Sequence, residues 1–257
     1  MPLTPAHAAA APLLQRLLRP LGLTLPLSAL VIGTMTPDFA YLIRLNPGGG
    51  PWHTRLGLLQ FCLPVGVATW WIYRLIIGPA LLRLLPPGLG AAAGARVAPG
   101  PTLRLLPGAG LAVLLGAVSH DVWDSFTHES RGGIRWITGL DAPVTMARTG
   151  SLPWYAILQY ASSVIGLVVI VAIIWRWVMA QPRAARHVPV GEGAWRVRET
   201  CLLLLAGVLG AGLNASRVHQ PGIELTFGLA AVGAMSALAV ALLAYGIVDL
   251  IRRGREA

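Results

Sequence analysis

One short stretch near the middle of the chain combines side chains that can bind a divalent metal. In GAVSHDVWDSFTH (residues 116–128), His120 and Asp124 are four residues apart. On a helix this spacing places both side chains on one face, one turn apart. An imidazole nitrogen and a carboxylate oxygen so placed can coordinate one ion. His128 continues the same row, whereas Asp121 points about 100° away around the helix.

The His120–Asp124 pair alone does not establish a metal site, because a helix that emerges from a membrane also ends in polar residues that contact headgroups or water. Three other residues favour a shared site. His7 lies in the first apolar segment, Asp38 interrupts the second, and His53 precedes the third. A carboxylate in a break at membrane depth indicates a functional site. The predicted ligands of one divalent metal are His7, Asp38, His53, His120 and Asp124, with His128 as a possible additional ligand.

The ligand types favour zinc. Imidazole and carboxylate ligands without a thiolate suit Zn²⁺, and also Mn²⁺ or Fe²⁺. Cys62 and Cys201 each lie inside an apolar run with no Cys or His at metal-ligand spacing. We therefore interpret both cysteines as small buried hydrophobes.

The elements that must position these residues are membrane helices. The 257-residue chain is 55% hydrophobic and only 12% charged, whereas soluble domains carry about 25% charged residues. A transmembrane helix needs about 17–25 mostly apolar residues, and four uncharged runs reach this length while a fifth falls one short. The runs cover residues 56–73, 105–120, 149–175, 200–216 and 225–248. The prediction is an all-α integral membrane protein with about five transmembrane helices, and five such runs disfavour a soluble protein with buried helices.

Two further elements precede these helices. Thr4, as an N-cap, and Pro5 predict a short helix that runs to about Leu18. Residues 25–43 are apolar but contain Pro37-Asp38, and therefore form a half-spanning or re-entrant segment. Broken backbone at membrane depth is tolerated only where protein covers it or where it lines a wet cavity.

The predicted organisation is a single helical membrane domain over residues 1–257. Residues 1–53 hold the N-terminal helix and the broken segment, and residues 54–251 form the transmembrane bundle. Residues 78–104, rich in Pro, Gly and Ala, predict a flexible loop, and residues 128–153 predict a polar one. The predicted helices cover residues 54–77, 103–126, 154–178, 197–214 and 223–251.

Arginine placement predicts the orientation in the membrane. All twenty basic residues are arginine, and the net charge is +10. Arginines gather in the first and third loops and at the C-terminus, which the positive-inside rule assigns to the cytoplasm. His53 and the end of the second helix then face outward. No basic patch is interleaved with exposed aromatics, so nucleic acid is not an expected partner, and membrane lipids are.

Four motifs carry a resemblance to a known family. TPAHAAA, LPLSALVIGTMTPDF, HTRLGLLQFCLPVG and GAVSHDVWDSFTH together resemble the bacterial membrane proteins grouped as domain of unknown function 4184. The resemblance covers nearly the whole chain. It implies a fold and a location in the bacterial inner membrane, and no established activity.

A more distant resemblance is to the inner-membrane metal-dependent hydrolases and, through them, to zinc-dependent phospholipases C. Those proteins share an order of an early His, a Pro-Asp, a loop His and a His-x-x-x-Asp. The resemblance implies a ligand set of His7, Asp38, His53, His120 and Asp124. The chain departs from it in having no second His soon after His53 and no later His-x-x-x-Glu, which favours one metal over three.

These residues lead to a functional hypothesis and an alternative. The hypothesis is a metal-dependent hydrolase that acts on a phosphoester or ester of a lipid or lipid-linked molecule at the extracytoplasmic surface. Asp124 or Asp121 would accept a proton, and Arg55 and Arg131 would hold a phosphate oxygen. The alternative is a non-catalytic membrane protein whose His/Asp cluster is structural or binds a metal or a headgroup. A transporter is disfavoured, since the charges gather at one end and transport sites typically lie near the midplane.

Overall fold

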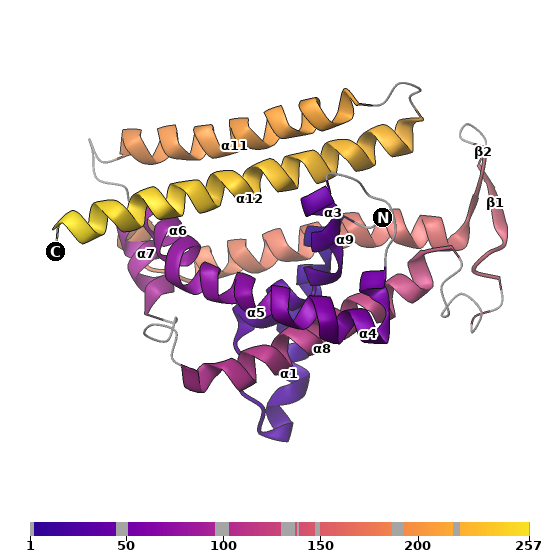
Figure 1. Ribbon diagram of the computed structural model, residues 1–257, viewed down its shortest axis with the longest axis horizontal. Coiled ribbons are helices and arrows are strands. Elements are labelled where there is room, and N and C mark those ends of the chain that lie inside the picture. Colours follow the sequence, from indigo (N-terminus) through magenta and orange to yellow (C-terminus); the bar gives the residue numbers. More distant parts are fainter. Residues whose placement is uncertain are drawn as a thin grey trace. The chain divides into compact units, whose positions relative to one another are not determined.

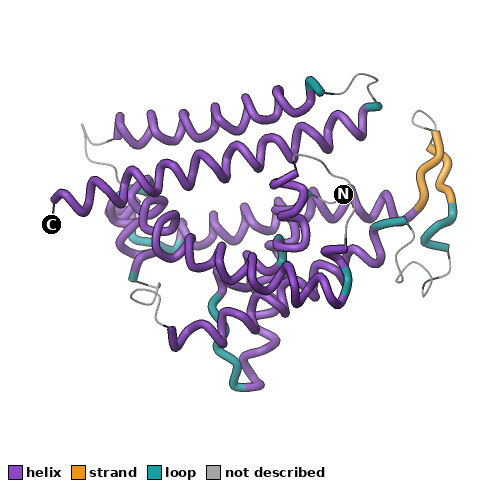
Figure 2. Tube along the Cα trace, in the orientation of Figure 1, coloured by secondary structure: helices purple, strands orange, loops and turns teal. Residues whose placement is uncertain are grey.

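The structure is a computed structural model that describes residues 3–44, 51–95, 103–129, 137, 139–146, 150–186, 193–217 and 222–256. These residues are almost entirely helical (Figures 1 and 2), which confirms the all-α prediction. Within the described ranges the strands are β1 (Pro143–Met146) and β2 (Gly150–Pro153), an antiparallel hairpin in which Val144 lies opposite Leu152. This hairpin falls within residues 128–153, for which a polar loop was predicted.

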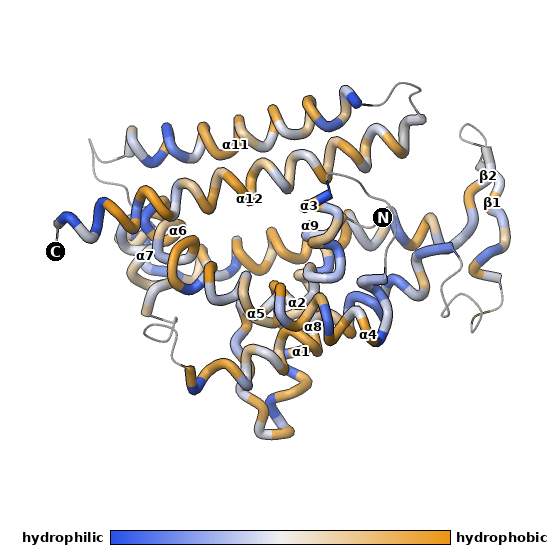
Figure 3. Tube along the Cα trace, in the orientation of Figure 1, coloured by the Kyte–Doolittle hydropathy of each residue, from blue (hydrophilic) through white to orange (hydrophobic). Residues whose placement is uncertain are grey.

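Among the described residues, five helices are long and apolar enough to cross a membrane, as predicted. Figure 3 shows apolar residues along much of α9 (Trp154–Met179) and α12 (Ile223–Glu256), with hydrophilic residues at the C-terminal end of α12. The protein is therefore a multi-pass membrane protein. The candidate spans are Arg55–Leu84, Leu103–Thr127, Trp154–Met179, Gly193–Ala215 and Leu225–Arg255.

The first span continues seven residues past its predicted end at residue 77, because two π-helical turns accommodate its prolines. The span begins with α4 (Arg55–Gly57) and continues through the π-helical turn η5 (Leu58–Cys62) into α5 (Leu63–Ile72), which contains Pro64. A second π-helical turn, η6 (Tyr73–Ile77), precedes Pro79. A proline lacks the N–H that an α-helix needs and clashes with the carbonyl four residues earlier. A π-helical turn widens the helix at that point.

The predicted loop over residues 78–104 is wrong for most of its length. It contains α6 (Gly78–Leu84) and α7 (Pro87–Gly94). Pro87 stands at the first position of α7, where its missing N–H is harmless. Alanines 91–93 then favour the helix, since alanine has the highest helix propensity.

The N-terminal region has the two elements that the sequence predicted. The first comprises η1 (Thr4–Ala9), α1 (Ala10–Leu18) and η2 (Arg19–Leu21). Leu3, not Thr4, occupies the N-cap position of η1, so the predicted capping role of Thr4 is wrong. The second element is broken as expected around Pro37. It comprises α2 (Leu27–Gly33), η3 (Thr36–Asp38) and α3 (Phe39–Arg44).

The chain forms two compact units. Unit 1 comprises residues Met1–Phe39, Gly50–Ala68 and Arg104–Ile173, and unit 2 comprises Ala40–Gly49, Thr69–Leu103 and Ile174–Ala257. The predicted His and Asp ligands all belong to unit 1. The interpretation of residues 1–257 as a single domain stays a prediction.

Unit 1 is built on a close contact between α2 and α8 (Leu106–Thr127). A Cβ atom at Gly33 would collide with the backbone of Val113. A Cβ atom at Gly116 would lie 2.6 Å from the Leu30 carbonyl oxygen and 2.7 Å from the Thr34 nitrogen. Because both positions are glycine, the two helices pack backbone against backbone, as small residues permit in membrane proteins.

Unit 2 is built on α11 (Gly193–Ala215) and α12, which run side by side and antiparallel (Figure 1). Gly210 and Gly233 bring these helices into close contact. Near the end of α12 the buried carboxylate of Asp249 pairs with Arg83 at 3.1 Å and with Arg253 at 3.0 Å.

Candidate metal centre

The predicted ligands come from four elements of unit 1. His7 lies on η1, Asp38 ends η3, and His53 ends η4 (Pro51–His53). His120 and Asp124 lie one turn apart on α8. The structure therefore brings together residues that the sequence separates by more than a hundred positions.

The ligand atoms face one another at the distances that one ion requires. Two atoms that each bind a tetrahedral zinc at about 2.0–2.2 Å lie about 3.3–3.6 Å apart. His120 Nε2 lies 3.3 Å from Asp124 Oδ2 and 3.6 Å from Asp38 Oδ1. His53 Nε2 lies 3.5 Å from Asp38 Oδ1, and His7 Nε2 lies 3.5 Å from Asp124 Oδ1. Each of these four separations is one that two ligands of the same tetrahedral ion would have.

His120 is common to two overlapping groups of possible ligands. One group is His7, His120 and Asp124, and the other is Asp38, His53 and His120. Within each group the ligand atoms lie within 4.8 Å of one another. His120 therefore occupies the centre of the cluster, and its ring stacks on that of His7 at a centroid distance of 3.9 Å.

The cluster is buried, and several of its polar atoms lack a hydrogen-bond partner. The side chains of His120 and Asp124 are 0% and 4% exposed. Nε2 of His7, Nε2 of His120 and Oδ1 of Asp124 make no hydrogen bond, although buried polar atoms in proteins nearly always do. All three atoms belong to the group of possible ligands formed by His7, His120 and Asp124, and a cation bound by that group would satisfy them.

Burial also keeps the ring of His7 neutral. Burial and the adjacent ring of His120 lower the pKa of His7 from 6.5 to about 4, against the opposing effect of Asp124 and Asp38. At neutral pH the ring is therefore uncharged and has one nitrogen with a free lone pair, which is the form of histidine that binds a metal.

Two threonines, which the sequence analysis did not assign to the site, orient the ligands. His120 Nδ1 lies 2.8 Å from the Thr34 carbonyl oxygen, which can only accept, so Nδ1 donates and Nε2 is left for a ligand bond. The Thr4 hydroxyl donates to Asp38 Oδ2 at 2.6 Å, and the other carboxylate oxygen faces His53 and His120. Thr4 is conspicuous in the sequence as a helix-start residue, but nothing local indicates its partner 34 residues away.

The N-terminal segment that carries Thr4 and His7 is anchored by α9. The backbone N–H of Leu3 donates to the Ser163 hydroxyl at 3.0 Å. A Cβ atom at Gly166 would lie 2.7 Å from the Ala6 carbonyl oxygen, so η1 rests directly on the α9 backbone. A helix well outside the ligand motifs thus holds the first ligand in place.

We expect Thr4→Val to weaken metal binding about 10- to 100-fold, the usual effect of removing a hydrogen bond to a ligand. Valine keeps the shape of threonine but cannot donate to Asp38 Oδ2. The measurement is the Zn²⁺ dissociation constant in competition with a chromophoric chelator. Thr4→Ser, which retains the hydroxyl, should bind nearly as the natural chain does. Equal affinities for Thr4→Val and the natural protein would show that this hydrogen bond does not orient Asp38.

The other predicted site residues lie outside these two groups. Nδ1 of His128 is 3.6 Å from Asp124 Oδ1, and its side chain is 22% exposed, at the edge of the cluster. Asp121 is half-buried on α8, and Arg55 is exposed at the start of α4. Arg131 lies outside the described residues. The catalytic roles of Asp121 and Asp124, and the substrate-binding roles of the two arginines, stay predictions.

Comparison with known proteins gives one match. The family model described as Domain of unknown function (DUF4184) covers residues 1–247. No curated protein and no solved structure matches the chain. The match extends over all of the elements that carry the His/Asp cluster, and the chain belongs to the DUF4184 family.

Proposed function

We propose that this protein is a metal-dependent hydrolase of the bacterial inner membrane that cleaves a phosphoester or ester of a lipid or lipid-linked substrate at the extracytoplasmic surface. One observation carries the proposal. Buried imidazole nitrogens and carboxylate oxygens face one another at 3.3–3.6 Å, and three of these atoms lack a hydrogen-bond partner.

The donor set supports one divalent ion. His7, Asp38, His53, His120 and Asp124 offer three nitrogens and two carboxylates without a thiolate, a combination that suits Zn²⁺ and also Mn²⁺ or Fe²⁺. Two carboxylates would offset the charge of such an ion, which a buried site needs.

A bound divalent ion would supply an acidified water molecule and polarise the oxygen of the scissile group. Around it, Asp124 has one carboxylate oxygen beside His7 and the other beside His120. It is therefore placed to accept a proton from a water molecule in the cluster. His128, adjacent to Asp124 and more exposed than the other histidines of the cluster, offers that proton a path to solvent.

Substrate class and location follow from charge and topology. Arg55, exposed and two residues after His53, is suited to hold a phosphate oxygen through forked hydrogen bonds. The arginine-rich loops and C-terminus favour a cytoplasmic location for that side of the bundle. With that orientation, five alternating spans support an outer-surface location for His53 and the C-terminal end of α8, where an amphiphile is the natural substrate.

The deep burial of the cluster favours a second candidate function. With Asp38, His53, His120 and Asp124 all below 5% side-chain exposure, the ion could serve a structural role and tie η1 and η3 to α8. Structural metal sites contribute directly to folding free energy.

The test is an activity panel with detergent-purified protein. Phospholipids and polyprenyl phosphates are supplied with Zn²⁺, Mn²⁺ or a chelator, for the natural chain and Asp124→Asn. The proposal expects turnover that requires metal and falls at least about a hundredfold in Asp124→Asn. Turnover that survives both the chelator and the substitution would exclude this mechanism. A stoichiometric metal without turnover on any substrate would favour the structural role.

A further inference from the structure

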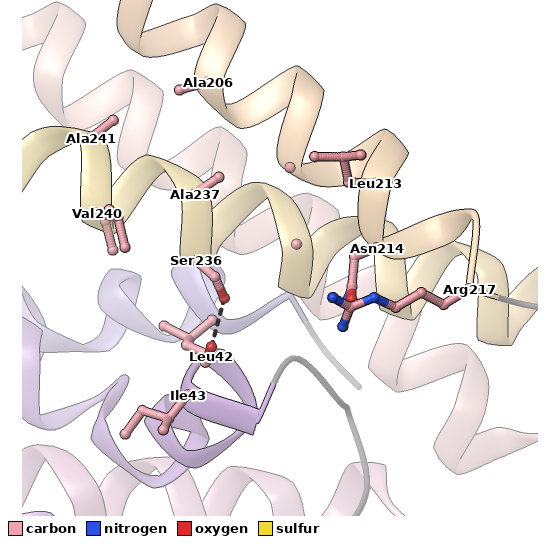
Figure 4. Close-up of a pocket in the computed structure, with 13 residues that line it drawn as sticks. Leu42, Ile43, Ala206, Leu213, Asn214, Arg217, Ser236, Ala237, Val240 and Ala241 are labelled. Atoms are coloured by element: carbon pink, nitrogen blue, oxygen red, sulfur yellow. Dashed lines mark hydrogen bonds between the residues drawn. The ribbon is translucent and has the colours of Figure 1, made fainter.

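Unit 2 contains an apolar groove between α3, α11 and α12. Its volume is about 760 Å³, within the range of about 300–1,000 Å³ for small-molecule sites. Figure 4 shows Leu42 and Ile43 on one side and Leu213 and Val240 on the helices that form the other. Leu213 and Val240 are 70% and 69% exposed, so the groove is open along its length.

Small residues create the hollow. Ala206, Gly210, Gly233, Ala237 and Ala241 line it. Gly210 and Gly233 bring α11 and α12 into backbone contact beneath it. Because both helices are membrane spans, the groove is open to hydrocarbon, and an extended lipid chain suits an apolar channel with few polar groups.

Two polar side chains of the groove donate to backbone carbonyls, and its charged side chain, Arg217, faces solvent. The Ser236 hydroxyl lies 2.9 Å from the Leu42 carbonyl oxygen, to which it donates, and the Asn214 amide donates to the Leu229 carbonyl at 2.8 Å. Arg217 follows the end of α11, its side chain is exposed, and the described residues that line the groove include no acidic side chain that would offset its charge. In Figure 4 its guanidinium lies beside Asn214, at one end of the row of lining residues.

We propose that this groove binds one chain of an anionic phospholipid, with the headgroup phosphate held by Arg217. A guanidinium forms paired, charge-assisted hydrogen bonds with a phosphate, and a cation at one end of an apolar channel matches an amphiphile with a negative head. The proposal is independent of the hydrolase function, because the groove and the His/Asp cluster share no residue.

The test measures lipid retention by native mass spectrometry with phosphatidylglycerol and phosphatidylcholine of identical chains. A chelator is present throughout, so that metal-dependent hydrolysis does not consume the probe. The natural chain should retain one phosphatidylglycerol and prefer it about tenfold over phosphatidylcholine, because the choline cation next to the phosphate of phosphatidylcholine repels the Arg217 guanidinium and offsets the charge-assisted contact. Arg217→Gln should lose this preference, while Arg252→Gln, an exposed arginine at the other end of α12, should keep it.

A second pair of variants tests the channel itself. Val240→Trp places a large ring in the groove at an exposed position and should weaken retention of both lipids. Val248→Trp, also exposed on α12 but outside the groove, should not. Equal retention of the two lipids by the natural chain would overturn the proposal. Unchanged lipid retention in Val240→Trp would also overturn it. So would a dimer that forms without lipid and is broken by Val240→Trp, because the groove would then be occupied by a second copy of the chain.

Discussion

Replacing His120 with alanine is expected to abolish stoichiometric metal binding and to weaken Zn²⁺ affinity by more than about a hundredfold. His120 belongs to both groups of possible ligands, and its Nε2 faces Asp38 and Asp124. Its loss therefore removes a bond from either arrangement of ligands. Elemental analysis after dialysis gives the stoichiometry, and chelator competition gives the affinity.

Two controls separate a lost ligand from a lost fold. His128→Ala, at the edge of the cluster, should retain its metal. Addition of Zn²⁺ at a hundredfold excess over Kd should stabilise the natural protein by about 2.7 kcal/mol and so raise its unfolding temperature. The unfolding temperature of His120→Ala should not change. One metal per chain in a folded His120→Ala protein would show that the ion binds outside the His/Asp cluster.

The second large effect is expected from Gly116→Ala, although the substitution adds only a methyl group. That group would meet the Leu30 carbonyl and the Thr34 nitrogen at 2.6 and 2.7 Å, and neither backbone atom can rotate away. α2 must therefore shift away from α8, and it carries with it the Thr34 carbonyl that orients His120. We expect a loss of about 1–3 kcal/mol of stability from overpacking, together with weaker metal binding.

The same helix provides a matched control. A Cβ atom at Gly108 would meet its nearest atom, Pro26 Cδ, at 4.0 Å, an ordinary contact. Gly108→Ala should therefore be neutral or gain about 0.5–1 kcal/mol from helix propensity. Thermal unfolding in detergent, with and without Zn²⁺, distinguishes the two variants. Equal stability and equal metal affinity for Gly116→Ala and the natural chain would rule out the backbone contact as the support of the cluster.

The sequence was informative where physical patterns are local. Uncharged runs long enough to span a bilayer predicted the five spans, and the four-residue spacing of His120 and Asp124 predicted their shared face. Prolines and glycines were less reliable signals. The Pro, Gly and Ala content of residues 78–104 predicted a loop from residue 78 onward, but a π-helical turn before Pro79 allows the helix to continue to Leu84.

The contacts that assemble the cluster have no local pattern. The Thr4–Asp38 hydrogen bond and the support of η1 by Gly166 join segments far apart in the chain. Their partners are defined only once α2 and α9 are packed. A glycine such as Gly116, inside an apolar run, looks the same in sequence whether it faces lipid or another backbone.

The distribution of the ligands along the chain has a consequence for biogenesis. His7, Asp38 and His53 leave the ribosome before any of α8 has been made, and His120 and Asp124 follow at the end of the second span. A nascent chain that stops before α8 holds only part of the cluster, including a carboxylate without the histidine that completes its surroundings. Closure of the cluster therefore requires synthesis and insertion of the second span, so the N-terminal ligands and the N-terminal helices stay incompletely packed until α8 is in place.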